Sequence, residues 1–179
     1  MIKISNKKIQ KIFGKAVIPN IKVLGVDGAS RSGWCKIKTD KTNCYLDYGF
    51  IDVKSSDKIF KYNQIINLFQ DIVKDNDVAI IEEAYYKRNL KVFQMLSRIS
   101  AIVYTLSHLA GINCKMFVLA TTARNYLGLQ GKAEQGKTKK EVIQKEFLEK
   151  TKIKVTDNDV VDAIILALNG TLKENTLEI

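Results

Sequence analysis

Four acidic side chains occupy positions from which they could act together in hydrolytic chemistry. Asp27 and Glu82 each follow a short apolar run of the kind that forms a buried strand. Asp159 and Asp162 are three residues apart at the entry to an apolar segment, so in a helix they lie on one face. Because α/β sheets place their sites at the carboxyl ends of their strands, we treat these carboxylates as one candidate catalytic cluster.

Such a cluster is suited to metal-dependent cleavage of phosphodiester bonds. Without a covalent intermediate, the reaction needs a nucleophilic water and a stabilised leaving alkoxide, and two Mg²⁺ ions about 4 Å apart supply both. Mg²⁺ takes oxygen ligands, whereas one His and three scattered Cys could not build a zinc or thiol site as readily. We therefore predict that Asp27, Glu82, Asp159 and Asp162 bind two Mg²⁺ ions, for which Mn²⁺ can substitute.

The same acids also have structural interpretations. Asp27 precedes a glycine and could start a turn through its side chain. Thr156 and Asp159 have the spacing of a capping box, and acids are favoured at helix N-termini. Asp162 is harder to explain in this way, because apolar residues flank it and a buried, unpaired acid is costly unless it binds a cation.

Positive charge is concentrated in two segments. The chain carries 29 Lys and Arg against 19 Asp and Glu, a net charge of +10. Residues 1–20 include five Lys and no acid, and residues 84–100 also include several basic side chains and no acid. A solvated Lys-rich surface would account for the charge alone, but its clustering favours a surface that binds a polyanion such as nucleic acid.

Hydrophobic periodicity predicts an α/β fold. Strands are expected at residues 21–26, 33–38, 44–53, 78–81 and 114–119. Helices are expected from a cap at Ser55 or Ser56 to about residue 74, and at about 90–109, 121–127, 139–150 and 156–169. Three strands joined by short turns, followed by crossover-linked strands, make a five-stranded mixed sheet with helices on both faces.

The chain of 179 residues is long enough for one domain with a sizeable core. We expect this domain at residues 21–170, after a basic N-terminal extension at 1–20 and before a frayed tail at 171–179. The extension could form a short amphipathic helix or a basic arm that orders on binding. A flexible basic loop at 128–137 leads into the helix at 139–150.

Composition excludes several classes of protein. With 10 Gly, one Pro and 46% hydrophobic residues, the chain is neither collagen-like nor disordered, and it lacks the ~18-residue apolar stretch of a membrane span. Cys35, Cys44 and Cys114 show no metal-binding spacing, and we interpret them as reduced and buried. The N-terminus has no features of a secretory signal, so we expect a cytoplasmic location.

The order and spacing of the acidic motifs resemble the RuvC-type Holliday junction resolvases. The resemblance rests on Asp27 within Val-Asp-Gly-Ala-Ser, on Glu82 after two isoleucines, and on Asp159 and Asp162, the latter followed by Ala. It covers about residues 22–169. The resemblance implies a ribonuclease-H-like fold, a homodimer, and a Mg²⁺-dependent endodeoxyribonuclease that cuts four-way or branched DNA by paired nicks.

The resemblance also assigns roles to residues that follow the acidic strand end. An aromatic wedge three positions after the family's Glu corresponds to Tyr85, with the neighbouring Tyr86 as the alternative. An Asn seven positions after that Glu corresponds to Asn89 when Glu82 is aligned, which selects Glu82 over Glu83.

A lysine at the start of a later helix is also implied. The family's active-site Lys stands three positions before the first Val of this helix and corresponds to Lys139, with Lys137 in reserve, whereas Lys140 is explained as a solvated helix charge. The helix at 90–109, which is apolar over more than one face, is expected at the two-fold interface. The side chains that we expect to contact DNA are Tyr85, Tyr86, Lys87, Arg88, Lys91, Lys132, Lys137 and Lys140.

The sequence departs from the family in two places. Asp27 is followed by Gly28 and Ala29 rather than by Pro and Gly, and about 20 residues precede the first strand. This divergence is similar to that of a phage-encoded member, acting in a bacterial or phage-infected cytoplasm. It leaves the cleavage-site preference and any partnership with a branch-migration motor open.

Other functions are compatible with parts of the pattern. An actin-like sugar kinase also begins with a strand and Gly-Val-Asp-Gly-Ala-Ser, but it would need a second domain and further phosphate loops, and an ATP-binding assay would identify it. A non-catalytic junction-binding protein would lack metal-dependent nicking. A ribonuclease-H-like nuclease could instead act on flaps, forks or RNA–DNA hybrids.

Overall fold

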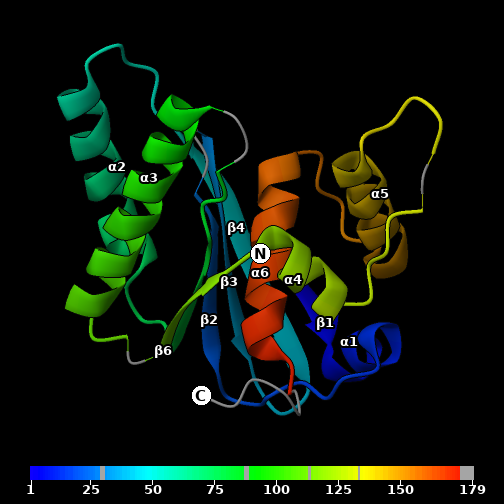
Figure 1. Ribbon diagram of the computed structural model, residues 1–179. Helices are drawn as coiled ribbons and strands as arrows, with labels where there is room; N and C mark the ends of the chain where they lie inside the picture. Colours follow the sequence, from blue (N-terminus) through cyan, green and yellow to red (C-terminus); the bar gives the residue numbers. More distant parts are fainter. Residues whose placement is uncertain (29–30, 87–88, 113, 133, 174–179) are drawn as a thin grey trace.

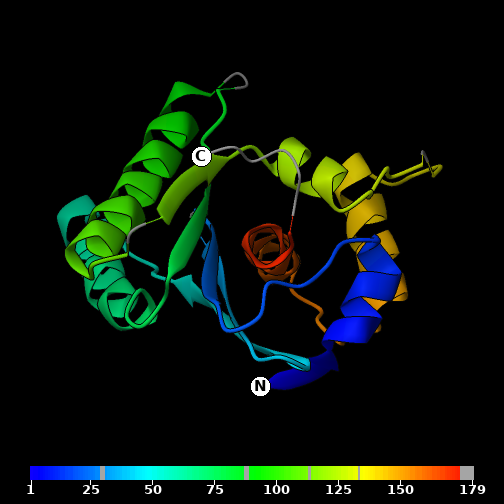
Figure 2. The same ribbon diagram turned by 90° about the horizontal axis from the view of Figure 1, so that it is seen from below.

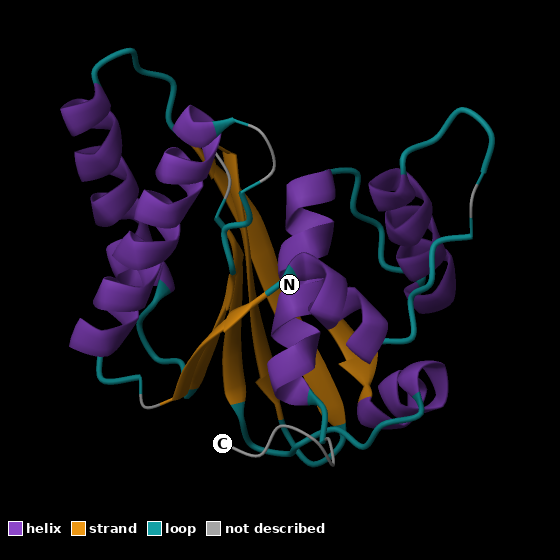
Figure 3. Cartoon of the chain, viewed as in Figure 1, coloured by secondary structure: helices purple, strands orange, loops and turns teal. Residues whose placement is uncertain are grey.

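The computed structural model describes residues 1–28, 31–86, 89–112, 114–132 and 134–173, in which one mixed sheet is covered by helices on both faces (Figure 1 and Figure 3). The strands are β1 (Ile2–Ser5), β2 (Lys22–Asp27), β3 (Arg31–Thr39), β4 (Asn43–Asp52), β5 (Val78–Glu82) and β6 (Cys114–Val118). The helices are α1 (Asn6–Phe13), α2 (Lys58–Ile72), α3 (Leu90–Leu109), α4 (Ala120–Tyr126), α5 (Lys139–Thr151) and α6 (Asn158–Thr171).

The strand order is β1-β4-β3-β2-β5-β6. Neighbours are antiparallel from β1 to β2, whereas β2, β5 and β6 run parallel to one another. Helices α2 and α3 cover one face, and α6 lies across the other with α1, α4 and α5 outside it (Figure 2). The α/β class and the mixed sheet are therefore confirmed. The parallel pairing matters for the site because it sets the carboxyl ends of β2 and β5 side by side.

The prediction of five strands was wrong, because the N-terminal segment supplies a sixth. β1 adds to the edge of the sheet in antiparallel register, from Ile2 opposite Leu46 to Ser5 opposite Asn43. Helix α1 follows at once and buries its apolar side, where Phe13 stacks on Phe147 of α5 with ring centroids 6.3 Å apart. A four-residue strand carries too short an alternation to be distinguished from a helix by periodicity. This segment is thus part of the sheet and core rather than a separate arm.

Alternation along the central strands sorts their side chains between two cores. Leu24 and Val26 of β2 and Ile81 of β5 pack with the α2 and α3 layer. Val23 of β2 and Ile80 of β5 pack instead with α6. Because side chains two apart along a strand share a face, Asp27 and Glu82 point to the α6 side of the sheet.

Helix α6 lies unusually close to the sheet because glycines face it. A Cβ at Gly25 of β2 would come within 2.3 Å of the Ala163 carbonyl oxygen. A Cβ at Gly33 of β3 would come within 2.2 Å of the Asp159 carbonyl oxygen. Since Gly33 is paired with Asp27 across the sheet, this close approach brings the first turn of α6 next to the end of β2.

Helix boundaries differ from the predicted ones where capping was misassigned. Asp57, not Ser55 or Ser56, caps α2 by accepting hydrogen bonds from the amides of Ile59 and Phe60. An Asp side chain one residue further along offers the same Asx geometry, so sequence preference alone does not distinguish these caps.

The segment that follows α1 meets the end of α6. Val17 and Leu172 form an isolated antiparallel bridge, and the Lys173 amide donates to the Ala16 carbonyl at 2.7 Å. Leu172 is buried, so the predicted fraying does not begin at residue 171. Residues 174–179 lie outside the described part of the chain.

The three cysteines are free. Cys35 and Cys44 are buried, as predicted, whereas Cys114 at the start of β6 is only half-buried. Among the residues that the structure describes, no helix combines the length and the apolar character that a membrane crossing requires.

Candidate active site

The parallel register of β2 and β5 brings Asp27 and Glu82 together. Val26 lies opposite Ile81, so the next residues, both acidic, stand side by side at the strand ends. Burial, followed by a hydrogen bond and charge repulsion from Glu82, raises the pKa of the Asp27 carboxyl well above its usual range. Glu83 is exposed, and its amide instead bonds to the Val118 carbonyl of β6. The choice of Glu82 over Glu83 therefore matches the geometry.

Asp162 is buried and held by side chains from two other helices. Arg124 of α4 contacts its Oδ1 at 3.0 Å, and Lys140 of α5 contacts its Oδ2 at 2.8 Å. The Gln144 amide nitrogen lies 3.4 Å from Oδ2 and donates to the Asn158 carbonyl at 2.9 Å. Two cations thus compensate a carboxylate that burial would otherwise make costly.

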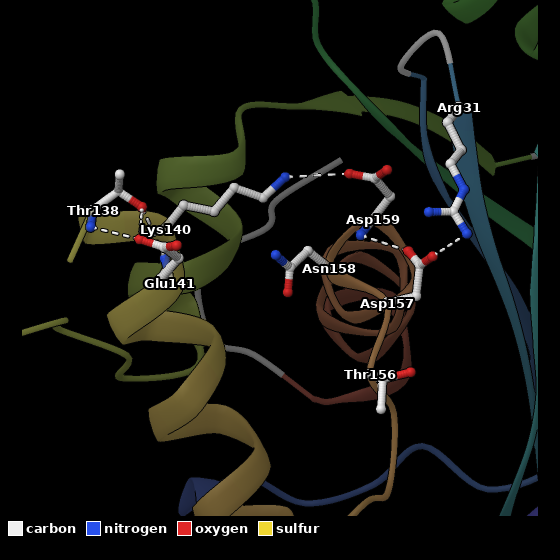
Figure 4. A pocket seen from close by; sticks show the side chains of 8 residues that line it. All are labelled: Arg31, Thr138, Lys140, Glu141, Thr156, Asp157, Asn158 and Asp159. Carbon is white, nitrogen blue, oxygen red and sulfur yellow. Dashed lines mark hydrogen bonds and ion pairs between the residues drawn. The ribbon is translucent and has the colours of Figure 1, made fainter.

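Asp159 lies on the same side of α6 but does not form the predicted capping box. Asp157 is the N-cap, and its carboxylate accepts from the amides of Asp159 and Val160. The Asp159 carboxylate remains available and pairs with Lys140 at 3.5 Å, as Figure 4 shows. Asp159 therefore does not serve in a capping box, and its contact with Lys140 joins it to the acidic cluster.

Of the two neighbouring lysines on α5, it is Lys140 that reaches the acids. Lys139 is exposed, whereas the Lys140 ammonium contacts both Asp159 and Asp162. Burial alone would lower the pKa of Lys140, but Asp162, Asp27 and Asp159 together raise it. The interpretation of Lys140 as a solvated charge was wrong, because a shift of one helix position turns the side chain by about 100°.

A pocket of about 650 Å³ opens beside this cluster, between the N-terminal turns of α5 and α6 (Figure 4). It is lined by Arg31, Thr138, Lys140, Glu141, Thr156, Asp157, Asn158 and Asp159. Arg31 forms an ion pair with Asp157 and stacks on Phe50, with its guanidinium carbon 3.8 Å from the ring centroid. These contacts fix the end of α6 from the β3 side.

Three other predicted DNA-contacting residues follow β5 along the chain. Tyr85 and Tyr86 are 66% and 52% exposed, and Tyr86 packs edge-on against Phe93. Lys91 is exposed in the first turn of α3, where Asn89 is the N-cap.

The loop before α5 also carries predicted DNA contacts. Lys132 is exposed, but Lys137 is paired with Glu134 at 2.6 Å. Lys87 and Arg88 lie outside the described residues.

The donor chemistry of the cluster suits Mg²⁺, which takes oxygen ligands. Asp27 is buried beside Glu82, whose charge opposes its ionisation, and a divalent cation there would relieve this repulsion. Within the described ranges, however, no three His, Cys, Asp or Glu side chains come together in a way that could hold a metal ion. Arg124 and Lys140 compensate Asp162 in this arrangement.

Sequence reasoning missed three residues that support the acids. Arg124 and Gln144 hold Asp162, and Ser100 of α3 donates its hydroxyl to the Glu82 carbonyl at 3.1 Å. Gln144 had a signal, because it stands four residues after Lys140 and therefore on the same helix face. Arg124 had none, since its short helix is brought to α6 only by tertiary packing.

The fold is similar to that of solved structures of RuvC and of a yeast Holliday junction resolvase. RuvC from T. thermophilus in complex with a Holliday junction substrate aligns with a TM-score of 0.65 and 15% identity, over 86% of this chain and 98% of that one. Another Thermus thermophilus RuvC structure aligns at 0.64 and 15%, over 86% and 99%. The yeast mitochondrial Holliday junction resolvase Ydc2 aligns at 0.54 and 13%, over 89% and 81%.

By sequence, no protein-family model and no curated protein matches the chain. The structural matches show that the chain has the RuvC-type fold. They confirm the fold that the acidic motifs implied.

Proposed function

From the RuvC-type fold and the acids gathered at one edge of its sheet, we infer that this protein is a metal-dependent endodeoxyribonuclease that resolves four-way DNA junctions by paired nicks. The observation that carries the proposal is the pairing of Asp27 with Glu82 beside an Asp162 that Lys140 and Arg124 hold. A reaction on a polyanion makes use of both features, the acids for metal and the basic side chains for substrate.

In this proposal Asp27, Glu82, Asp159 and Asp162 hold Mg²⁺, or Mn²⁺ in its place. When bound, the metal would supply a nucleophilic water and stabilise the leaving oxygen. Arg124 and Gln144 are positioning residues, because they reach the reaction only through Asp162. Lys140 lines the pocket, where its ammonium can move from the acids to a phosphate oxygen of the substrate.

The DNA would lie across the carboxylate edge of the sheet. Tyr85, which is 66% exposed three residues after Glu82, can stack on an unpaired base at the crossover. Lys91 and Lys132 would contact backbone phosphates, together with Lys87, Arg88 and a Lys137 released from Glu134. These contacts recognise charge and branch shape rather than sequence.

A homodimer would place two such sites on one junction. Helix α3 buries Ile99, Val103 and Leu106 against its own sheet, yet Leu109 is 75% exposed. Tyr104 of α3 is partly exposed and stacks on the exposed Phe117 of β6, with centroids 5.3 Å apart. This apolar strip is the surface that we assign to the partner copy, and sedimentation velocity at micromolar concentration should show a dimer.

The direct test is incubation with a synthetic four-way junction, a matched duplex, a fork, a flap and an RNA–DNA hybrid, with and without Mg²⁺. We expect symmetric nicks in the junction only when the metal is present. Asp27→Asn and Glu82→Gln should abolish cutting while junction binding persists, whereas the neighbouring exposed-site control Glu83→Gln should cut normally. Manganese binding by the free protein, followed by electron paramagnetic resonance, should weaken in Asp27→Asn.

Two outcomes would replace this proposal. Cutting of forks or hybrids in preference to junctions would assign the same site to a different substrate. Tight junction binding without any nicking would make the protein a junction-binding module.

A further inference from the structure

Helix α1 carries exposed lysines that lack an acidic partner within the described part of the chain, unlike most lysines of its neighbour α5. Lys7, Lys8 and Lys11 are exposed on its outer side, and Lys3 is exposed on the preceding strand β1. No acid occurs in the sequence before Asp27. Within the described residues, the ammonium groups of these lysines make no ion pair with a carboxylate, although Lys3 lies 5.7 Å from the ring centre of Tyr45.

The lysines of the adjacent helix α5 behave differently. Lys150 pairs with Glu146 at 2.6 Å, and Lys145 pairs with Glu134 at 3.2 Å. These are the i,i+4 and loop contacts that an ordinary solvated helix uses to balance its charge. The two helices pack on each other through Phe13 and Phe147, so the contrast is between neighbours in one structure (Figure 2).

The first turn of α1 also violates the charge preference of a helix. Its N-cap Ser5 accepts from the Lys8 amide at 3.3 Å, so Lys8 occupies the position where a capping box has an acid. Helix α5 has Glu141 at the corresponding position and forms the complete box with Thr138. Two lysines next to the positive end of the helix dipole destabilise α1. A sequence that keeps such a local cost commonly does so for function.

We propose that the outer face of α1, formed by Lys7, Lys8 and Lys11 with Lys3 beside it, is a second phosphate-binding surface that holds a duplex arm of the DNA away from the cleavage site. The proposal rests on the proposed function for its substrate. The unpaired ammonium groups are the side chains whose contact with phosphates releases counterions without first breaking an ion pair.

The position of α1 explains why this surface would bind an arm rather than the crossover. Helix α5 begins at the pocket, where Lys140 contacts the acids, and its later turns contact α1 through Phe147. A helix rises about 1.5 Å per residue, so Lys140 and Phe147 lie about 10 Å apart along the axis of α5. Duplex DNA would therefore meet the lysines on the outer side of α1 only after it has left the cleavage site.

The test compares two triple variants of the full chain that remove the same charge. Lys7, Lys8 and Lys11 are changed to Gln in the first, and the paired lysines Lys74, Lys145 and Lys150 are changed to Gln in the second. Junction binding is measured against salt concentration for arms of about 20 and about 5 base pairs. For long arms, we expect the α1 variant to bind about 10- to 100-fold more weakly near 0.1 M salt and its log–log salt slope to fall by about 2–3. The second variant should match the unmodified protein.

Two further measurements distinguish a loss of DNA contacts from a folding defect. Replacing the three α1 lysines with Arg should restore the slope, and short arms should abolish the difference between the Gln variant and the unmodified protein. Equal slopes for the two Gln variants, or a loss independent of arm length, would overturn the inference while leaving junction cleavage intact. If instead no DNA is cut but the α1 variant still loses duplex binding, the proposed function fails and this inference stands.

Discussion

The carboxylate end of α6 and the outer face of α1 both depend on lysines, but in opposite surroundings. At α6, Arg124 and Asp162 are largely buried, Lys140 and Asp159 are partly exposed, and each charge has a partner. On α1, the lysines are exposed and unpaired within the described chain. Removing one member of a buried pair leaves its partner uncompensated, whereas removing one exposed lysine leaves nothing unsatisfied. The net charge of +10 alone therefore does not show which basic side chains are paired with acids and which are free to bind an anion.

The largest effect should come from Arg124→Ala. The Arg124 and Asp162 side chains are only 13% and 5% exposed, so the substitution removes the more buried of the two cations that compensate this carboxylate. We expect a loss of about 3 kcal/mol in unfolding free energy, measured by denaturant titration. Arg124→Lys should recover part of the stability and of junction cleavage. Unchanged stability of Arg124→Ala would mean that Lys140 alone compensates Asp162.

The two neighbouring lysines of α5 give the next comparison. Lys140→Gln removes the cation that reaches both helix acids, and cleavage should fall about 100-fold, as when one preorganised donor is lost from an active site. Lys139→Gln should have little effect on the single-turnover rate. If Lys139→Gln instead lost more cleavage than Lys140→Gln, Lys139 would be the active-site lysine, as the family spacing implied.

The third prediction concerns the close packing of the first turn of α6 against Gly33. A Cβ there would meet the Asp159 carbonyl at 2.2 Å, so Gly33→Ala must displace the first turn of α6. We expect a loss of about 1–3 kcal/mol and a parallel loss of cleavage. Gly49→Ala is the control, because its Cβ would meet only the Trp34 side chain at 3.0 Å. Equal melting temperatures for the two variants would show that α6 can move without cost.

The exposed aromatic at the strand end should matter less. Tyr85→Ala removes a stacking surface worth about 1–3 kcal/mol per base, so cutting should slow about tenfold with little change in junction affinity. Tyr86→Ala should have the smaller effect, because that ring already packs against Phe93. Full cutting by the double variant would limit this loop to phosphate contacts.

The smallest effect on stability should appear at α1, with the opposite sign. Lys8→Glu places an acid where Ser5 can complete a capping box, and it should stabilise the protein by about 0.5 kcal/mol. The same change should weaken binding to long-armed junctions. Stabilisation without weaker binding would show that Lys8 makes no contact with DNA.

Much of the framework could be predicted from local pattern. The bounds of α3 and the approximate positions of β2 to β6 follow from hydrophobic period, and Asp27 and Glu82 could be placed at strand ends for the same reason. Glu82 could be separated from Glu83 by a family spacing. β1 could not be recognised, since four residues of alternation are consistent with either a strand or one side of a helix.

The acids, their order and the clustered lysines were determined by the sequence alone, because residue type and strand period are local properties. Which cation meets which acid was decided only by tertiary structure. Lys140 rather than Lys139 reaches Asp162 because α5 packs beside α6 at a particular rotation, and Arg124 joins them from a helix 38 residues away in the chain. Such contacts depend on how closely α6 approaches the sheet over Gly25 and Gly33, and that approach is a sum of packing over many residues that no single motif encodes.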